Sequence, residues 1–149
     1  MKARIKWVQD VMFVAESGSG HAVVIDGAPE AGGRNVGCRP MELMLMGLGS
    51  CSAFDVVTIL RRGREKIVDC VVELAAERAA TDPKVFTEIQ MKYIVTGVGL
   101  DAKKVQRAVD LSAQKYCSAT AIMAKTAQIT HSYEIRNSGS GPTPHTNDG

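Results

Sequence analysis

The residues that could carry redox chemistry are four cysteines, Cys38, Cys51, Cys70 and Cys117. None of them forms a CxxC pair, and no cysteine–histidine spacing matches a zinc site. The charged N-terminus has no apolar signal core, so we expect no export peptide and a reducing, cytoplasmic compartment. Standing structural disulfides are therefore not expected, and the chemistry to weigh is that of free thiols.

Sequence context sets Cys51 and Cys117 apart from the other two cysteines. Cys51 has glycine and serine before it and serine and alanine after it, so another molecule has room to approach. Cys117 lies at a junction of two helical stretches, where exposed backbone N–H groups lower a thiol pKa. Cys70 lies on the inward face of a strand, where cysteine acts as a small hydrophobe, and Cys38 lies in a loop as an accessible, incidental thiol. From the residues alone, a functional pair and an inert core filler both remain open.

The segment from Pro40 to Arg64 must position Cys51. Small or apolar residues fill almost every position of 41–60, so the pattern predicts a helix that is buried on all sides. Pro40 suits a first helical turn, and the basic residues at the other end suit a helix C-terminus. Glu42 and Asp55 lie within the apolar run, which favours a core helix over a membrane span.

The rest of the chain reads as short strands followed by helices. Alternation of apolar and polar residues predicts strands at 2–8, 11–16, 21–26, 67–77, 86–96 and 129–136, and helical spacing predicts helices at 102–116 and 118–127. Strands that cluster indicate an α+β fold, with antiparallel sheets packed around the central helix. We expect one domain over residues 1–136 and a disordered tail over 137–149, which has nothing to bury. Because one small sheet cannot cover so apolar a helix, a homodimer is favoured.

Composition excludes other classes of protein. The chain has 149 residues, of which 45% are hydrophobic, enough for a substantial core. A net charge of +2 implies no broad basic surface and argues against nucleic-acid binding. No metal-ligand motif or cofactor motif stands out, and His21 and His131 fall within predicted strands.

Four short blocks resemble the OsmC/Ohr family of osmotically induced and organic-hydroperoxide-resistance proteins. The blocks are PMEL at 40–43, GSCSA at 49–53, DVV at 55–57 and KYCS at 115–118. The separation of the two cysteines and the order of strands and helices also match, over roughly residues 1 to 136. The resemblance implies an OsmC-like fold, assembled as an intertwined homodimer with its sites at the subunit interface.

The resemblance also implies a chemistry, which is a thiol peroxidase acting on organic hydroperoxides in oxidative-stress defence. Cys51 would be the peroxidatic thiolate that becomes a sulfenic acid, and Cys117 would condense with it to a disulfide. A dithiol reductant, typically a lipoylated protein in this family, would restore both thiols. Neither a metal nor an organic cofactor is required.

The activating groups of the family match less closely. Well-studied members carry a glutamate directly after the proline that opens the helix, where this chain has Met41 and places its acid at Glu42. Glu42 and Cys51 are nine residues apart, about 180° around a helix, so Glu42 is expected to point away from the thiol. Asp55 lies one turn past Cys51 and would raise its pKa unless the carboxylate is paired elsewhere.

Family members also hold the thiolate with an arginine near the N-terminus. Arg34 and Arg39, in the loop before the central helix, are the candidates here. Because this activation site matches incompletely, two alternatives stay open. One is a non-enzymatic homodimer that binds a small apolar ligand or a partner protein. The other is a redox sensor that forms the same disulfide but turns over slowly.

Overall fold

A computed structural model describes residues 1–138 of the chain, which divide in sequence between Met46 and Gly47 into two compact units. Each unit is described here by itself. The predicted tail lies outside the described residues except for its first two positions, and Asn137 is the last residue of a strand. A single domain over residues 1–136 stays a prediction. The α+β class is confirmed, with two small sheets and a long helix, α1 (Pro40–Arg62), among the described residues.

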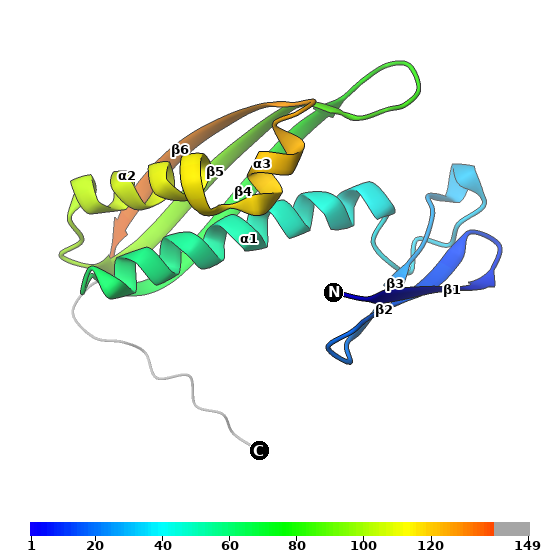
Figure 1. Ribbon diagram of the computed structural model, residues 1–149, viewed down its shortest axis with the longest axis horizontal. Helices are drawn as coiled ribbons and strands as arrows, with labels where there is room; N and C mark the ends of the chain where they lie inside the picture. The colour runs from blue at the N-terminus through cyan, green and yellow to red at the C-terminus, as the bar shows by residue number, and fades with distance from the viewer. Residues whose placement is uncertain (139–149) are drawn as a thin grey trace. The chain divides into compact units, whose positions relative to one another are not determined.

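The first unit contains a three-stranded antiparallel meander (Figure 1). Its strands are β1 (Ala3–Gln9), β2 (Met12–Ser17) and β3 (Ala22–Ile25). They pair in the order β1-β2-β3, with Trp7 opposite Phe13. Asp10 turns the first hairpin at φ 47°, a left-handed conformation that aspartate tolerates better than most residues. The predicted strands are confirmed to within about a residue at either end.

The second unit is built on a larger sheet of order β4-β5-β6. Its strands are β4 (Lys66–Arg78), β5 (Phe86–Val98) and β6 (Gln128–Asn137). The long antiparallel hairpin of β4 and β5 is confirmed. The expectation of antiparallel pairing is wrong for β5 and β6, which run parallel. The reason is the helical crossover between them, since a parallel pair needs a long connection.

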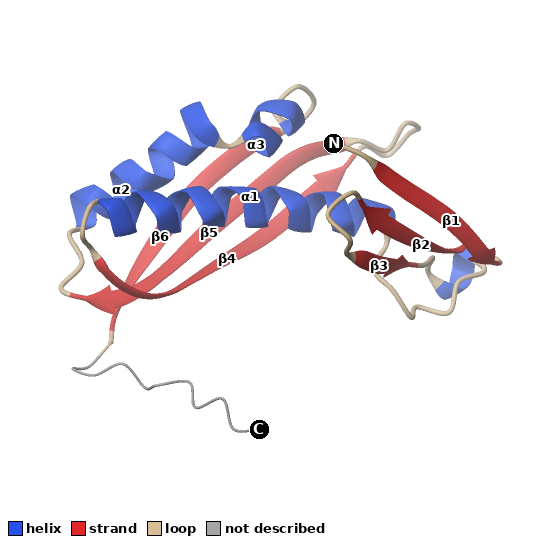
Figure 2. Cartoon of the chain, turned by 60° about the horizontal axis from the view of Figure 1, so that its bottom comes forward, coloured by secondary structure: helices blue, strands red, loops and turns tan. Residues whose placement is uncertain are grey.

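Helices cover one face of this sheet (Figure 2). Besides α1 they are α2 (Ala102–Leu111) and α3 (Ser118–Met123). The strand residues that face them follow the predicted alternation, and the most buried on β5 are Ile89, Met91, Tyr93 and Val95. The core of the second unit therefore lies between the helices and this face of the sheet.

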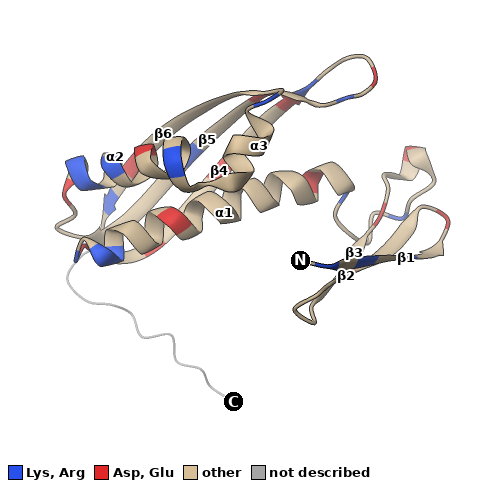
Figure 3. Cartoon of the chain, in the orientation of Figure 1, with Lys and Arg blue, Asp and Glu red and all other residues tan. Residues whose placement is uncertain are grey.

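The prediction that α1 is buried on all sides is wrong for the single chain. Its buried side chains form one stripe at i, i+4 spacing, namely Leu48, Ser52, Val56 and Leu60. Phe54 on the same helix is 72% exposed. Figure 3 shows the middle of α1 almost free of charge. By length and composition α1 could cross a membrane, but its inner stripe packs as in the core of a soluble domain.

The helix predicted over 102–116 changes character part-way. Asp101 caps it, because its carboxylate accepts the N–H of Lys103 at 2.8 Å. The regular α-helix then ends at Leu111, and Ser112–Tyr116 form a wider π-helical turn, η2. The N–H of Cys117 closes this turn by donating to the carbonyl of Ser112 at 3.0 Å. Such turns often occur at functional sites.

Candidate functional site

The two cysteines that the sequence sets apart come from different elements of the second unit. Cys51 lies mid-way along α1 and is half-buried. Cys117 follows η2, caps the short helix α3 and is 3% exposed. The Sγ atom of Cys117 accepts the N–H of Thr120 at 3.4 Å. Both side chains are free thiols.

The structure places these two thiols near each other, since the Cys51 thiol perturbs the pKa of Cys117. Burial raises the pKa of Cys117, and the backbone N–H of Thr120, which donates to its Sγ atom, lowers it. The neighbouring Cys51 thiol raises that pKa further. Cys117 is buried and Cys51 is half-buried, so two residues distant in the sequence bring their thiols to one region of the second unit.

Cys70 and Cys38 do not belong to this pair. Cys70 lies on β4, where burial and then the charge of Asp69 raise the pKa of its thiol. That agrees with the expectation of an unreactive core thiol. Cys38 lies in the first unit, and its thiol points to the carbonyl of Val24 at 3.7 Å.

Beside the thiol pair lies a buried polar network that sequence reasoning missed. The Ser52 hydroxyl bonds to the Tyr93 hydroxyl and, at 2.7 Å, to the hydroxyl of Ser112. Ser112 donates to the carboxylate of Asp55 at 3.2 Å. The side chains of Ser52, Tyr93 and Ser112 are each 0% exposed. The one signal in the sequence is a serine at an inward position of each helix, where an apolar residue would be ordinary.

Asp55 is half-buried, and its carboxylate accepts a hydrogen bond from the neutral hydroxyl of Ser112. This bond holds the carboxylate but does not neutralise a negative charge near Cys51. The role of Asp55 beside Cys51 stays a prediction. Tyr93, at the other end of the network, is neutral at ordinary pH because burial raises its pKa to about 12.

Tyr93 also stacks on His131 of β6. The two ring centroids are 6.2 Å apart, with 18° between the ring planes. Burial lowers the pKa of His131, and its Nε2 atom is buried without a partner among the described residues. His131 is therefore a neutral core histidine, as its place in a strand suggested.

Three of the proposed supporting residues, Arg34 and Arg39 of the loop and Glu42 of α1, lie in the first unit and are engaged there. The guanidinium of Arg34 contacts the carboxylate of Asp10 at 3.4 Å. The carboxylate of Glu42 accepts the backbone N–H of Arg39 at 2.9 Å and lies 4.0 Å from its guanidinium. Glu42 thus caps the start of α1, which is a structural use of this acid. Their predicted role beside Cys51 stays a prediction.

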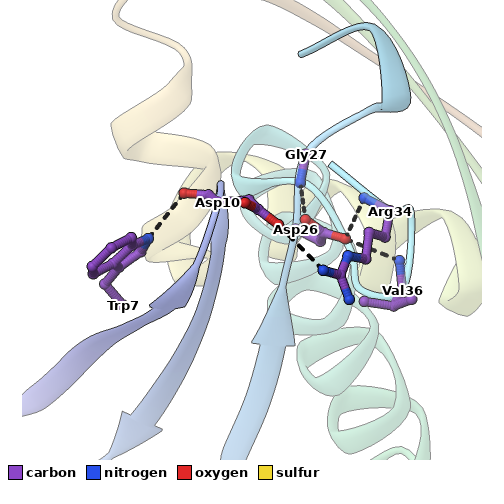
Figure 4. A network of polar contacts seen from close by, with 6 residues as sticks. All are labelled: Trp7, Asp10, Asp26, Gly27, Arg34 and Val36. Atoms are coloured by element: carbon purple, nitrogen blue, oxygen red, sulfur yellow. Dashed lines mark hydrogen bonds and ion pairs between the residues drawn. The ribbon is translucent and has the colours of Figure 1, made fainter. Parts of the chain in front are cut away.

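A second residue that sequence reasoning missed, Asp26, organises this loop. Its buried carboxylate accepts the N–H groups of Gly27, Arg34 and Val36 at 2.8, 2.9 and 3.2 Å (Figure 4). Burial would raise the pKa of Asp26, but these three donors outweigh it and hold the pKa below its usual value. The loop between β3 and α1 is therefore folded around one anion.

A groove of about 390 Å³ lies on the sheet of the second unit. It is lined by the central parts of the three strands, Glu73–Ala75, Gln90–Lys92 and Thr130–Ser132. Neither Cys51 nor Cys117 lines it. Among residues 1–138, no group of three or more His, Cys, Asp or Glu side chains is arranged to hold a metal ion.

Comparison with known proteins decides the family. The model of the family described as OsmC-like protein matches residues 32–132. The chain belongs to the OsmC/Ohr family. It is 49% identical over 138 residues to Protein YhfA of Escherichia coli K12, covering 91% of this chain and 98% of that relative.

Solved structures of the OsmC/Ohr family share the fold. A hypothetical protein from Aquifex aeolicus, 28% identical, superposes with a TM-score of 0.81 and covers 93% of this chain and 97% of its own. An organic hydroperoxide resistance protein OsmC from Legionella pneumophila, 15% identical, has a TM-score of 0.67 and covers 90% and 96%. At that identity the likeness shows the fold alone. The resemblance inferred from the four sequence blocks is thereby confirmed.

Proposed function

We propose that this chain reduces organic hydroperoxides, with Cys51 as the attacking thiolate and Cys117 as the thiol that closes a disulfide with it. The observation that carries the proposal is that the Cys51 thiol lies near the Cys117 thiol, which is only 3% exposed. A nearby second thiol favours condensation of a sulfenic acid to a disulfide over its further oxidation.

The reaction balances without a metal or an organic cofactor. The Cys51 thiolate attacks the distal oxygen of the hydroperoxide, the O–O bond breaks, and the departing alkoxide takes a proton to become an alcohol. The sulfenic acid on Cys51 then reacts with the Cys117 thiol, forming an S–S bond and releasing water. A dithiol reductant, for which a lipoylated protein is the candidate, restores both thiols by two exchange steps and is itself oxidised to a disulfide.

Membership of the OsmC/Ohr family supports this chemistry. The Legionella neighbour is named as an organic hydroperoxide resistance protein, and we carry that activity over to this chain. The proposed setting is oxidative-stress defence in a bacterial cytoplasm, since the relatives named above are bacterial.

A homodimer is part of the proposal. Phe54 is 72% exposed and Ile122 is 68% exposed. Phe54 lies on α1, the helix of Cys51, and Ile122 lies on α3, the helix that Cys117 caps. Large apolar side chains gathered on helices that are otherwise poor in charge are typical of a surface that a second subunit covers. A second copy would also exclude water from the region around Cys51.

A redox sensor is the second candidate. It is favoured by the pairing of Arg34 with Asp10 and of Arg39 with Glu42, since both arginines already have an anionic partner. A thiolate without a close cation reacts slowly. The sensor would form the same disulfide but would not sustain turnover.

A steady-state assay with cumene hydroperoxide and dihydrolipoamide tests the peroxidase. We expect the wild-type protein to consume hydroperoxide over many turnovers and Cys51→Ser to lose at least about 100-fold of that rate. Cys38→Ser is the matched control and should keep the wild-type rate. Equal rates for wild type and Cys51→Ser would refute the proposal. Disulfide formation without turnover would support the sensor, and unmodified thiols would support a binding protein.

A further inference from the structure

Three hydroxyls and one carboxylate join the element that carries Cys51 to the element that leads to Cys117. Ser52 is the next residue to Cys51 on α1, and Ser112 is the first residue of the π-helical turn η2. Their Oγ atoms are 2.7 Å apart, and the hydroxyl of Ser112 also lies 3.4 Å from the carbonyl of Ser52. Tyr93 binds Ser52 from the sheet, and Asp55 binds Ser112 from α1.

One arrangement of the protons satisfies every short bond of this network. Each hydroxyl has one proton to donate, and a carboxylate oxygen accepts. When Ser112 donates to Asp55, Ser112 accepts from Ser52, and Ser52 in turn accepts from Tyr93. The competing donations, from Ser112 to the Ser52 carbonyl at 3.4 Å and from Tyr93 to the Met91 sulfur at 3.9 Å, are longer. A chain that ends on a charge is polarised along its length, which strengthens each bond in it.

Ser112 is the member that reaches Cys117. Its carbonyl accepts the N–H of Cys117 at 3.0 Å, and this bond closes the wide turn. The side chain of Ser112 is thus tied to the Cys51 helix while its main chain is tied to Cys117. Both serines are 0% exposed, so breaking their hydrogen bond would leave hydroxyls unsatisfied in the interior.

We propose that Ser112 is a positioning residue for the thiol pair: by fixing the π-helical turn to α1 through Ser52 and Asp55, it sets how readily Cys51 and Cys117 close to a disulfide. This rests on the proposed function only in taking Cys51 and Cys117 as the redox pair. The hydroxyl does not touch the reacting sulfurs. It acts through the backbone that presents Cys117.

The test is the equilibrium between the purified protein and glutathione. One oxidised glutathione takes two electrons from the thiol pair, so each Cys51–Cys117 disulfide formed releases two glutathione thiols. We expect Ser112→Ala to lower the equilibrium constant for the protein disulfide at least about tenfold. Ser50→Ala is the matched control, because Ser50 flanks Cys51 on its other side and, within residues 1–138, its hydroxyl bonds only to the carbonyl of Gly47 on its own helix. It should leave the constant unchanged.

Two further variants separate positioning from general destabilisation. Tyr93→Phe removes only the distal hydroxyl of the chain and should lower the constant by a smaller factor, about threefold. Ser52→Ala combined with Ser112→Ala should cost less than the sum of the two single changes, because both remove the bond between Ser52 and Ser112. If Ser112→Ala does not fold, the glutathione equilibrium constants of Ser52→Ala and Tyr93→Phe are compared instead, and Ser52→Ala should show the larger decrease.

A folded Ser112→Ala protein with a constant within about twofold of wild type would overturn the inference. So would a wild-type protein that forms no Cys51–Cys117 disulfide with oxidised glutathione. The equilibrium needs no hydroperoxide, so the two proposals can fail separately. A protein that does not consume cumene hydroperoxide but still shows the Ser112 effect refutes only the peroxidase.

Discussion

The hydroxyls of Ser52 and Ser112 are 60 residues apart in the chain and 2.7 Å apart in space. This one bond crosses from the helix of Cys51 to the turn that ends at Cys117. The α-helix that begins at Ala102 widens at Ser112, and that serine is bound on both its side chain and its carbonyl. The proposed positioning role of Ser112 rests on this double attachment.

Replacing Cys117 should stop the reaction at its first product. With one equivalent of cumene hydroperoxide and no reductant, the wild-type protein is expected to lose two titratable thiols per chain. Cys117→Ser should lose one and carry a sulfenic acid on Cys51, detected as a dimedone adduct by mass spectrometry. Cys70→Ser, which alters a thiol outside the pair, should behave as wild type. Loss of two thiols in Cys117→Ser would contradict the assignment.

Replacing Phe54 should separate a dimer into single chains. Phe54 is 72% exposed, so Phe54→Asp changes little in the packing of one chain. Burying a phenylalanine side chain contributes about 1.5–3 kcal/mol to the free energy of association. A two-fold interface buries this side chain from both subunits, so the dissociation constant of the dimer should rise at least about 100-fold in the variant. Light scattering after size exclusion measures the mass. Thr130→Asp, on the open face of the sheet, is the control. Equal masses for wild type and Phe54→Asp would place the interface elsewhere.

Tyr93 should make the second unit sensitive to alkali. Its folded-state pKa of about 12 lies above the ordinary 10.0, so the folded state holds the phenolic proton more tightly than the unfolded state. The contribution of this tighter proton binding to the free energy of unfolding is fully present below pH 10 and is lost as the pH rises toward 12. Tyr93→Phe loses the hydrogen bond to Ser52 and should melt at a lower temperature at neutral pH. Because only the wild type is destabilised by ionisation of the unfolded-state phenol, this difference should narrow above pH 10. Melting curves that stay parallel would contradict this, and Tyr133→Phe is the control.

Asp26 should hold the loop of the first unit in a pH-dependent way. Its pKa in the folded state is below the ordinary 3.8, so its contribution is present at neutral pH and is lost as the pH falls through the folded value. In Asp26→Asn the amide protons of Arg34 and Val36 should exchange faster at neutral pH, because their acceptor is weakened. Asp10→Asn, which removes an exposed ion pair, should change little. Unchanged exchange in Asp26→Asn would refute this role.

Elements with a clear local period could be predicted from the sequence. The alternation in β4 and β5 and the apolar run of α1 gave their positions closely, because each pattern is set by neighbours along the chain. The parallel pairing of β6 depends on how the helical crossover packs, which no local pattern reports. The exposed side of α1 was missed because a helix can be apolar all round for a partner that lies outside the chain.

The sequence suggests the candidate thiols, which remain a prediction, but not the polar groups beside them. Cys51 and Cys117 could be chosen by their neighbours and by the family resemblance. Ser52, Ser112 and Tyr93 were missed because a small serine or an inward tyrosine reads as core packing until its partner is known. In the loop before α1, the sequence points to Arg34 and Arg39 as candidates to hold the thiolate. It does not reveal that Asp26 accepts three backbone N–H groups of this loop.

The central claim is tested most directly by mapping the cysteines of the wild-type protein after one equivalent of cumene hydroperoxide. Digestion without reductant and mass spectrometry should find one peptide pair joined through Cys51 and Cys117, with Cys38 and Cys70 still free to react with iodoacetamide. Recovery of Cys51 and Cys117 as unmodified thiols, or crosslinks that run through Cys38 or Cys70, would contradict the account.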